Sequence, residues 1–304
     1  MTRSDFYEIS MNKYFLFLIA SVLLVFSSLL VPEYSHAAEV NLGASVWCAW
    51  WNPYWMNKSE MPFVPTLKGY PTAAGGPLLS IKIDEQWGIE ANYMYGKFEN
   101  KRSGYIPANV PILMIPLLIS ISEDRWTERH ELDFTISNSI NAYVNIFGGL
   151  KYSGHFVDNQ IKIVIFTIKS GNDNNYTGPE LGVRFRIPLV STLSLVPAVT
   201  WVMQFGTYEP NTGLIYNIYN SLSGISKTTV MYYGPDITLS MAYQIKQAHI
   251  TLALGGRFQY LMIKNIGTGG YPGDGGYDMF GGVNVMAMYT FNATSGSSEK
   301  QEKK

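Results

Sequence analysis

The sequence has few charged residues and a single cysteine. Only 15% of its 304 residues are charged, where about 25% is typical of soluble domains. The lone Cys48 excludes an internal disulfide framework and a cysteine-rich zinc site. A net charge of −1 favours neither nucleic-acid binding nor electrostatic attachment to a membrane. Beyond the N-terminal leader, no apolar run is long enough to span a membrane as a helix.

The leader has the organisation of a secretory signal peptide. A short basic start at Met11 precedes an apolar run over residues 14–31, and the small residues Ser35 and Ala37 follow it. Small residues at these two positions mark a cleavage point before the mature chain. We therefore predict a signal peptide over residues 1–37 with the real start at Met11. An uncleaved anchor helix is the alternative.

Alternation of apolar and polar residues dominates residues 228–291. Every second residue from Ile250 to Met262 is apolar or glycine, and Thr251 and Arg257 lie between them. A β-strand sends alternate side chains to opposite faces, so one face of this segment is apolar. Such runs exceed the roughly five to six residues of soluble strands. They fit the roughly nine to eleven residues of a tilted membrane-spanning strand.

The same pattern recurs along the mature chain. Ten strands are predicted, at residues 40–50, 77–84, 87–97, 128–137, 142–153, 176–187, 192–205, 229–243, 247–263 and 276–291. The predicted connections are alternately short and long, as in bacterial barrels, which have an even strand number. We therefore predict an all-β, antiparallel up-and-down transmembrane β-barrel over residues 38–291, followed by a disordered polar tail over residues 292–304.

Two segments leave the strand number open, because a hairpin in either would make twelve strands. The apolar stretch 105–121 contains three prolines, which exclude a regular helix. It could fold into the lumen as a plug or constriction, or form a lipid-facing extension of the barrel, and we favour inward folding. Residues 161–169 could extend two strands above the membrane or form a short hairpin.

Aromatic residues gather near the predicted strand ends. Four tryptophans and a tyrosine fall within residues 47–55, and they could form either a carbohydrate-stacking platform or an aromatic belt at the lipid headgroups. We favour the belt, because amphipathic rings are enriched there. The predicted girdle comprises Trp47, Trp50, Trp51, Trp55, Tyr233, Tyr243, Tyr260, Tyr289 and Phe291.

Charged residues fall on the other face of the predicted strands. The predicted lumen-lining set is Lys82, Asp84, Glu90, Glu131, Asp133, Lys151, Glu180, Arg184, Arg186, Asp236, Arg257 and Asp278. Buried charges need partners, so these groups could form a network that closes the barrel. They could also line a narrow polar pathway and set its ion preference. Nothing in the sequence indicates a metal site or a cofactor.

Catalytic motifs are lacking. A hydrolase would need a histidine positioned by a carboxylate or beside a serine nucleophile. His130, His155 and His249 are the histidines of the mature chain, and each fits an interface or rim position better. We therefore predict that the protein is not an enzyme.

With its signal peptide, amphipathic hairpins and a last strand that ends in Phe291, the chain resembles bacterial outer-membrane β-barrel proteins as a broad class. The resemblance implies insertion into the outer membrane, with outer-membrane lipid and the barrel-assembly machinery as partners. The function we expect is a narrow porin-like passage for ions or small solutes. A closed barrel that acts as a structural or adhesion protein through its extracellular loops is the alternative, and an outer-membrane hydrolase is a distant third.

Overall fold

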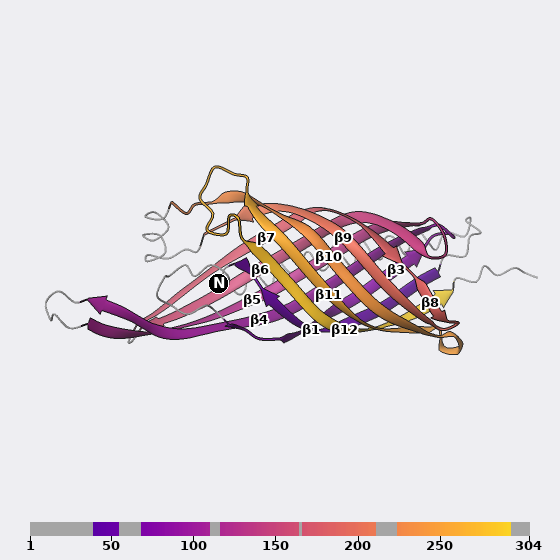
Figure 1. The fold of residues 1–304 in the computed structure, drawn as a ribbon, viewed down its shortest axis with the longest axis horizontal. Helices are drawn as coiled ribbons and strands as arrows, with labels where there is room; N and C mark the ends of the chain where they lie inside the picture. The colour runs from indigo at the N-terminus through magenta and orange to yellow at the C-terminus, as the bar shows by residue number, and fades with distance from the viewer. Residues whose placement is uncertain (1–38, 55–67, 110–115, 164–165, 211–223, 293–304) are drawn as a thin grey trace, which may run out of the picture. The chain divides into compact units, whose positions relative to one another are not determined.

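The computed structural model describes residues 39–54, 68–109, 116–163, 166–210 and 224–292 (Figure 1). Ten long strands build it: β1 (Glu39–Asn52), β3 (Thr72–Lys82), β4 (Trp87–Asn109), β5 (Pro116–Ser139), β6 (Val144–Ile163), β7 (Phe166–Phe185), β9 (Leu193–Tyr208), β10 (Thr228–Ile245), β11 (Ile250–Asn265) and β12 (Tyr277–Asn292). The short strands β2 (Lys68–Gly69) and β8 (Ile187–Val190) pair with β4 and β9. Residues Lys246–Ala248 form a 3-10 turn, η1. No helix in these ranges is long and apolar enough to cross a membrane.

The ten long strands form one closed antiparallel ring. Each pairs with the long strands next to it along the chain, and β12 pairs with β1 from Glu39↔Asn292 to Asn52↔Met279. Closure leaves no free edge around the body of the barrel, so the backbone groups of each strand have partners on both sides there, except where β4 continues past its neighbour. The prediction of a ten-stranded up-and-down barrel is confirmed.

The two ends of the barrel differ in their connections. Tight turns over residues 83–86, 140–143 and 246–249 lie at one end, where β1 begins and β12 ends. We call this the short-turn end. The opposite, long-loop end carries the connections that follow β1, β4, β6, β9 and β11.

The strands β4 to β7 continue well past their neighbours at the long-loop end. The pairing of β4 with β5 runs as far as Asn109↔Pro116, and this hairpin projects beyond the other strands (Figure 1). Residues 161–163 and 166–169 likewise continue β6 and β7, so they are strand extensions.

The favoured inward folding of residues 105–121 is therefore wrong for the described part of that segment, which extends the barrel wall. The continuous ladder gives the backbone groups partners that an inward-folded coil would lack. Pro107 lies where β4 has lost its other neighbour, and an edge strand tolerates proline. Residues 110–115 lie outside the described part of the chain.

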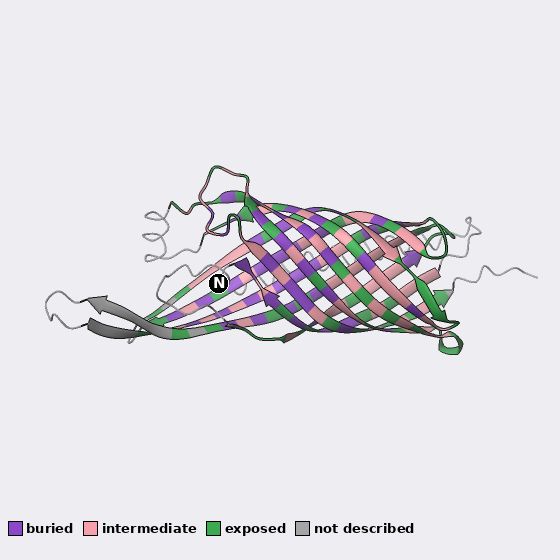
Figure 2. Cartoon of the chain, in the orientation of Figure 1, coloured by how far each residue is buried: buried purple, intermediate pink, exposed green. Residues whose placement is uncertain are grey.

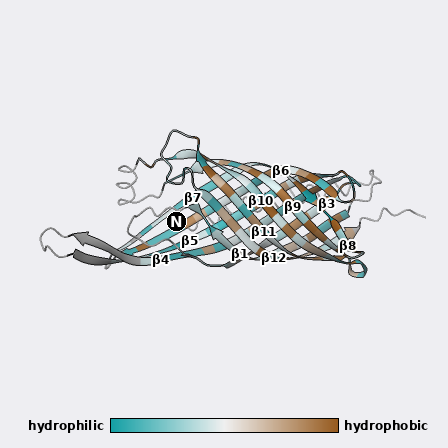
Figure 3. Ribbon diagram, in the orientation of Figure 1, coloured by the Kyte–Doolittle hydropathy of each residue, from teal (hydrophilic) through white to brown (hydrophobic). Residues whose placement is uncertain are grey.

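The outer face of the barrel is apolar around its middle. On β10, Ile237, Leu239 and Met241 are 44%, 53% and 44% exposed, between the outward-facing Tyr233 and Tyr243. Exposed and buried residues alternate along the strands in the same way (Figure 2), and apolar residues band the wall (Figure 3). Ten residues of strand span roughly 33 Å, and at a tilt of about 45° they cover roughly 23 Å. This height matches the apolar band of about 25 Å on transmembrane barrels.

Candidate functional site: the barrel lumen

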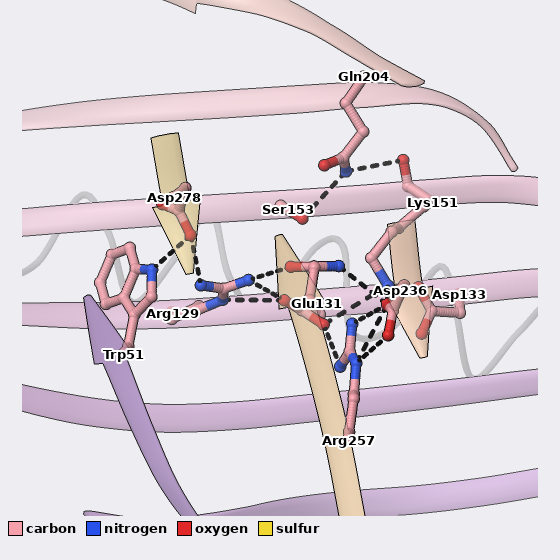
Figure 4. A network of polar contacts seen from close by, with 11 residues as sticks. Trp51, Arg129, Glu131, Asp133, Lys151, Ser153, Gln204, Asp236, Arg257 and Asp278 are labelled. Carbon is pink, nitrogen blue, oxygen red and sulfur yellow. Dashed lines mark hydrogen bonds and ion pairs between the residues drawn. The ribbon is translucent and has the colours of Figure 1, made fainter. Parts of the chain in front are cut away.

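Charged side chains from opposite walls meet inside the barrel. Strands β5 and β11 lie five places apart in the ring of ten, so a contact between them crosses the lumen. Alternation places Arg129, Glu131 and Asp133 of β5 on the inner face, and Arg257 and Gln259 of β11 face them from the opposite wall (Figure 4).

Glu131 lies at the centre of this arrangement. One carboxylate oxygen accepts hydrogen bonds from Arg129 on the same strand. The other accepts one from Arg257 Nη1 at 2.8 Å and lies 3.5 Å from Lys151 Nζ on β6. The side chains of Glu131 and Lys151 are each 1% exposed. A buried carboxylate is tolerated when paired in this way, because removing a charge from water is otherwise costly.

A second carboxylate, Asp236 on β10, completes the cross-lumen contacts. Its oxygens accept hydrogen bonds from Arg257 at 2.6–3.1 Å and from Gln259 Nε2 at 2.9 Å. Lys151 lies 3.9 Å from Asp236 and 2.5 Å from Asp133, and so links the two walls.

Another buried carboxylate in the lumen is Asp278 on β12. It accepts a hydrogen bond of 2.8 Å from Trp51 Nε1 and lies 3.5 Å from Arg129 Nη1. We refer to the whole set as the ionic layer: Arg129, Glu131, Asp133, Lys151, Asp236, Arg257 and Asp278. Its three cations and four carboxylates hold β5, β6, β10, β11 and β12 together across the lumen.

Large aromatic side chains fill the lumen on the long-loop side of the ionic layer. We call this set the aromatic layer: Trp51, Tyr54, Phe98, Tyr176, Tyr208, Tyr232, Tyr271 and Phe280, all buried. The Arg129 guanidinium lies 4.9 Å from the Trp51 ring and 4.6 Å from that of Phe280, which joins the two layers by cation–π contacts. The Tyr232 hydroxyl lies 3.5 Å from Tyr176 and 3.1 Å from Tyr271. Burial raises the pKa of the Tyr271 phenol, which lies in the connection after β11.

The lumen is more open toward the short-turn end. There Arg184 on β7 makes a bidentate ion pair with Glu90 on β4, at 2.6 and 2.8 Å. These side chains are 32% and 29% exposed although both face inward. The lumen is therefore open around this ion pair.

Most of the predicted lumen-lining residues face inward. Those that the structure places on the inner face are Glu90, Glu131, Asp133, Lys151, Glu180, Arg184, Asp236, Arg257 and Asp278. Lys82 and Arg186 lie exposed at the short-turn rim, where Arg186 Nε is 3.5 Å from Ser194 Oγ. Sequence reasoning missed Arg129 and Gln259. Each lies two residues from a predicted lumen residue on the same strand, so the alternation of side chains could have predicted that both point inward.

Asp84 was predicted to line the lumen, and this is wrong. Its Oδ1 accepts hydrogen bonds from the backbone N–H groups of Gln86 and Trp87, both at 2.7 Å. An aspartate that bonds the backbone two residues ahead is a turn residue, and it closes the connection between β3 and β4.

Replacing Asp84 with alanine should lower the free energy of unfolding by about 1 kcal/mol, because two turn N–H groups lose their acceptor. Urea titration of the barrel in lipid vesicles would measure the change. Asp84→Asn, whose side-chain oxygen can still accept, is the matched control. Equal losses in both variants would contradict the turn role.

The predicted aromatic girdle divides between the two faces. Trp50, Tyr233, Tyr243, Tyr260, Tyr289 and Phe291 lie on the outer face. Trp47 and Trp51 are buried on the inner face, so their assignment to the girdle is wrong. Adjacent tryptophans on one strand must point to opposite faces, which aromatic content alone could not resolve. Trp55 lies outside the described residues.

His130 and His155 lie on paired strands but face opposite sides of the barrel wall, and His249 lies at the short-turn end. His130 faces outward, where its Nδ1 is 2.7 Å from the Tyr93 hydroxyl and its ring packs on Tyr95 and Phe156. His155 is buried between Trp51 and Tyr176, and His249 ends the η1 turn with a φ of 53°. Within the described ranges, none is hydrogen-bonded to a carboxylate, and no group of three or more potential metal ligands occurs.

Comparisons with known proteins find similar folds only. No protein-family model matches the chain, and no curated protein matches it. Similar solved structures include the outer-membrane protease OmpT from Escherichia coli, at 10% identity and a TM-score of 0.46 over 86% of this chain and 97% of that one. Ail of Yersinia pestis, in complex with a heparin analogue, has 8% identity and a TM-score of 0.30 over 84% and 99%. The toluene transporter TodX of P. putida has 7% identity and a TM-score of 0.29 over 85% and 91%.

These proteins differ in what they do, and the similarity is too low to favour any one of their functions. The assignment of the architecture rests on the structure of this protein: a closed ring of ten antiparallel strands, an apolar outer band and a polar interior. With these features, the chain has the architecture of outer-membrane β-barrels.

Proposed function

We propose that the protein is a bacterial outer-membrane barrel with a closed lumen, and that it acts as a structural or adhesion protein through its long-loop end. The observation that carries this proposal is the ionic layer, in which Arg257 on β11 bonds Glu131 on the opposite wall at 2.8 Å. A barrel of about eight strands is filled by its own side chains. A barrel of ten strands whose interior holds these large charged and aromatic side chains is filled in the same way.

Two stacked layers support a closed lumen. An ion that passes the ionic layer must separate buried pairs such as Arg257–Asp236, at 2.6 Å, and separating buried partners is costly. It must then pass the aromatic layer, where Tyr208 and Tyr271 have their ring centroids 4.7 Å apart. The ionic layer is built from strand residues alone, whereas Tyr54 and Tyr271 of the aromatic layer lie in the connections after β1 and β11.

The wall of β4 to β7 is the part of the barrel best placed to meet partners. Its outer face carries ion pairs beyond the apolar band: Lys97–Glu128 at 3.2 Å and Lys101–Glu99 at 2.7 Å. The hydrogen bond from Lys101 to Glu99 raises the pKa of the lysine. Charged pairs of this kind belong in water or among lipid headgroups. We infer that the extended wall stands clear of the membrane on the extracellular side.

A narrow passage for ions or small solutes is the second candidate. The partial exposure of Glu90 and Arg184 favours it, because these inward-facing charges at the short-turn end are accessible to solvent. A passage would require the ionic layer to rearrange.

A hydrolase is the third candidate, and the geometry favours it least. Catalysis by a histidine requires a positioned carboxylate or nucleophile. His130 contacts aromatic residues on the outer face, and His155 lies within the aromatic layer. We infer that the protein is not an enzyme.

Shortening the extended hairpin tests the proposed function. A variant in which residues 105–120 are replaced by Asn-Gly joins Gly104 to Ile121, which are paired in β4 and β5. We expect the barrel to fold, because the ionic layer and the ring are untouched. Attachment of expressing cells to a polystyrene surface, and their settling by autoaggregation, should fall several-fold.

The matched control is Gln247→Ala in the η1 turn, at the opposite end of the barrel. It should leave attachment unchanged at equal surface levels of protein. If the shortened hairpin attaches as well as the wild type, the extended wall is not the working part of the protein and the adhesion proposal fails.

A further inference from the structure

The inner face of the extended wall carries an unusual concentration of uncharged polar side chains. Asn100 on β4 lies in register with Arg125 on β5, Arg125 with Asn159 on β6, and Asn159 with Ser170 on β7. The next row toward the barrel contributes Thr127 and Asn172. We call these six residues the polar wall: Asn100, Arg125, Thr127, Asn159, Ser170 and Asn172.

Several groups of the polar wall lack a hydrogen-bond partner within the described part of the chain. Both amide atoms of Asn100 have none, and this side chain is 1% exposed. The Thr127 hydroxyl has none and is fully buried. Ser170 Oγ and Asn172 Oδ1 also have none, although both residues are half-buried and Asn172 Nδ2 donates to the Glu209 backbone carbonyl at 3.3 Å.

Such groups need an explanation. Buried polar side chains are nearly always hydrogen-bonded, and an unsatisfied one points to a bound water, ion or ligand. Leaving a buried donor or acceptor without a partner costs about 1–3 kcal/mol. Asn100 and Thr127, on the neighbouring strands β4 and β5, therefore indicate that a partner outside the protein chain completes them.

The chemistry of the polar wall identifies the class of that partner. Asparagine amides and hydroxyl groups each supply both donors and acceptors, and so match a ligand rich in hydroxyl groups. The charged pair on the same inner face, Arg125 with Glu123 at 2.9 Å, is neutral overall. The ligand therefore needs no net charge.

Aromatic rings lie next to the polar wall on the side of the lumen. Phe98 is two residues from Asn100 on the same face of β4, and its ring centroid is 5.5 Å from that of Trp51. Both rings are buried, so they border the polar wall without a free face, and a ligand there is held by hydrogen bonds to the amide and hydroxyl groups. Binding sites in general combine apolar surface with a few convergent polar groups.

We propose that the polar wall, bordered on the lumen side by Phe98, forms a binding site for an uncharged saccharide that enters from the long-loop end. The proposal rests on the proposed function, since it gives the extended wall a ligand. It concerns a different face of that wall from the one that bears the ion pairs.

Binding should be measured with the mature chain, residues 38–304, in lipid nanodiscs. The probes are maltoheptaose and chitohexaose, which are uncharged, with heparin fragments as the sulfated comparison. Quenching or enhancement of tryptophan fluorescence reports binding next to Trp51. We expect saturable binding of at least one uncharged probe and weaker binding of the sulfated one.

The decisive variant is Asn100→Leu combined with Thr127→Val. It should weaken saccharide binding at least tenfold. It should leave the ligand-free barrel as stable as the wild type or more so, because the replaced groups have no partner to lose. Thr135→Val, on the same face of β5 nearer the short-turn end, should leave binding unchanged.

Three results would overturn the inference: no binding of either uncharged probe, tighter binding of heparin fragments, or a double variant that binds normally. A double variant that is strongly destabilised without ligand also counts against it, because the groups would then have structural partners. The proposed function fails separately, through stable conductance or unchanged attachment of the shortened hairpin.

Discussion

Replacing Glu131 with alanine should lower the free energy of unfolding by about 3–5 kcal/mol, the loss typical of breaking a buried ion pair. The carboxylate neutralises Arg129, Arg257 and Lys151, which come from both walls of the lumen. Without it, three buried cations share the remaining carboxylates. Urea titration in lipid vesicles, followed by tryptophan fluorescence, would measure the loss.

Glu128→Ala is the matched control for this prediction. Glu128 lies three residues away on the same strand, but it faces outward and pairs with Lys97, and both side chains are more than one third exposed. Exposed ion pairs contribute about 0–1 kcal/mol, so the control should lose less than about 1 kcal/mol. Similar losses in the two variants would show that the ionic layer does not stabilise the barrel.

An arginine at the middle of the outer face should be almost as damaging. Leu239→Arg places a charge between the girdle residues Tyr233 and Tyr243, on a side chain that is 53% exposed. In a membrane this exposure is to lipid, where arginine at the midplane costs about 2–4 kcal/mol. The same titration in lipid vesicles would detect the change.

The comparison for Leu239→Arg is Thr229→Arg, on the same face of β10 but beyond Tyr233. Near the interface, an arginine costs only about 0–1 kcal/mol. If both positions tolerate arginine equally, the outer face is not lipid-facing and the strands do not span a membrane.

The sequence predicted the strands well, because alternation depends only on the neighbours of each residue along the chain. All ten predicted strands occur, and the parity of Glu131, Asp236 and Arg257 places them inside. The alternation along a strand shows which residues point inward, but it does not show which inward residues contact one another. That Arg257 bonds Glu131 across the lumen follows from strand stagger and ring closure, which are set by all the strands together.

Two of the incorrect predictions, for residues 105–121 and for Trp51, come from reading residue type without knowing the strand geometry. Apolar content and prolines made residues 105–121 look like a plug, whereas the pairing of β4 with β5 that makes them part of the wall is not readable from composition. Trp51 was assigned to the membrane interface by its residue type. Its position in the strand turns it inward, where its indole N–H bonds Asp278. In both cases the residue type suggested an environment that the geometry of the strands then decided.

The most direct test of a closed lumen is single-channel conductance of refolded residues 38–304 in a planar bilayer. We predict that the wild type, shown to be folded, gives no stable steps, because the ionic and aromatic layers fill the lumen. Arg129→Ala and Arg257→Ala combined with Tyr208→Ala and Tyr271→Ala open both layers and should give detectable steps in a sample shown to be folded. Stable stepwise conductance from the intact wild-type protein would contradict the closed barrel and establish a passage.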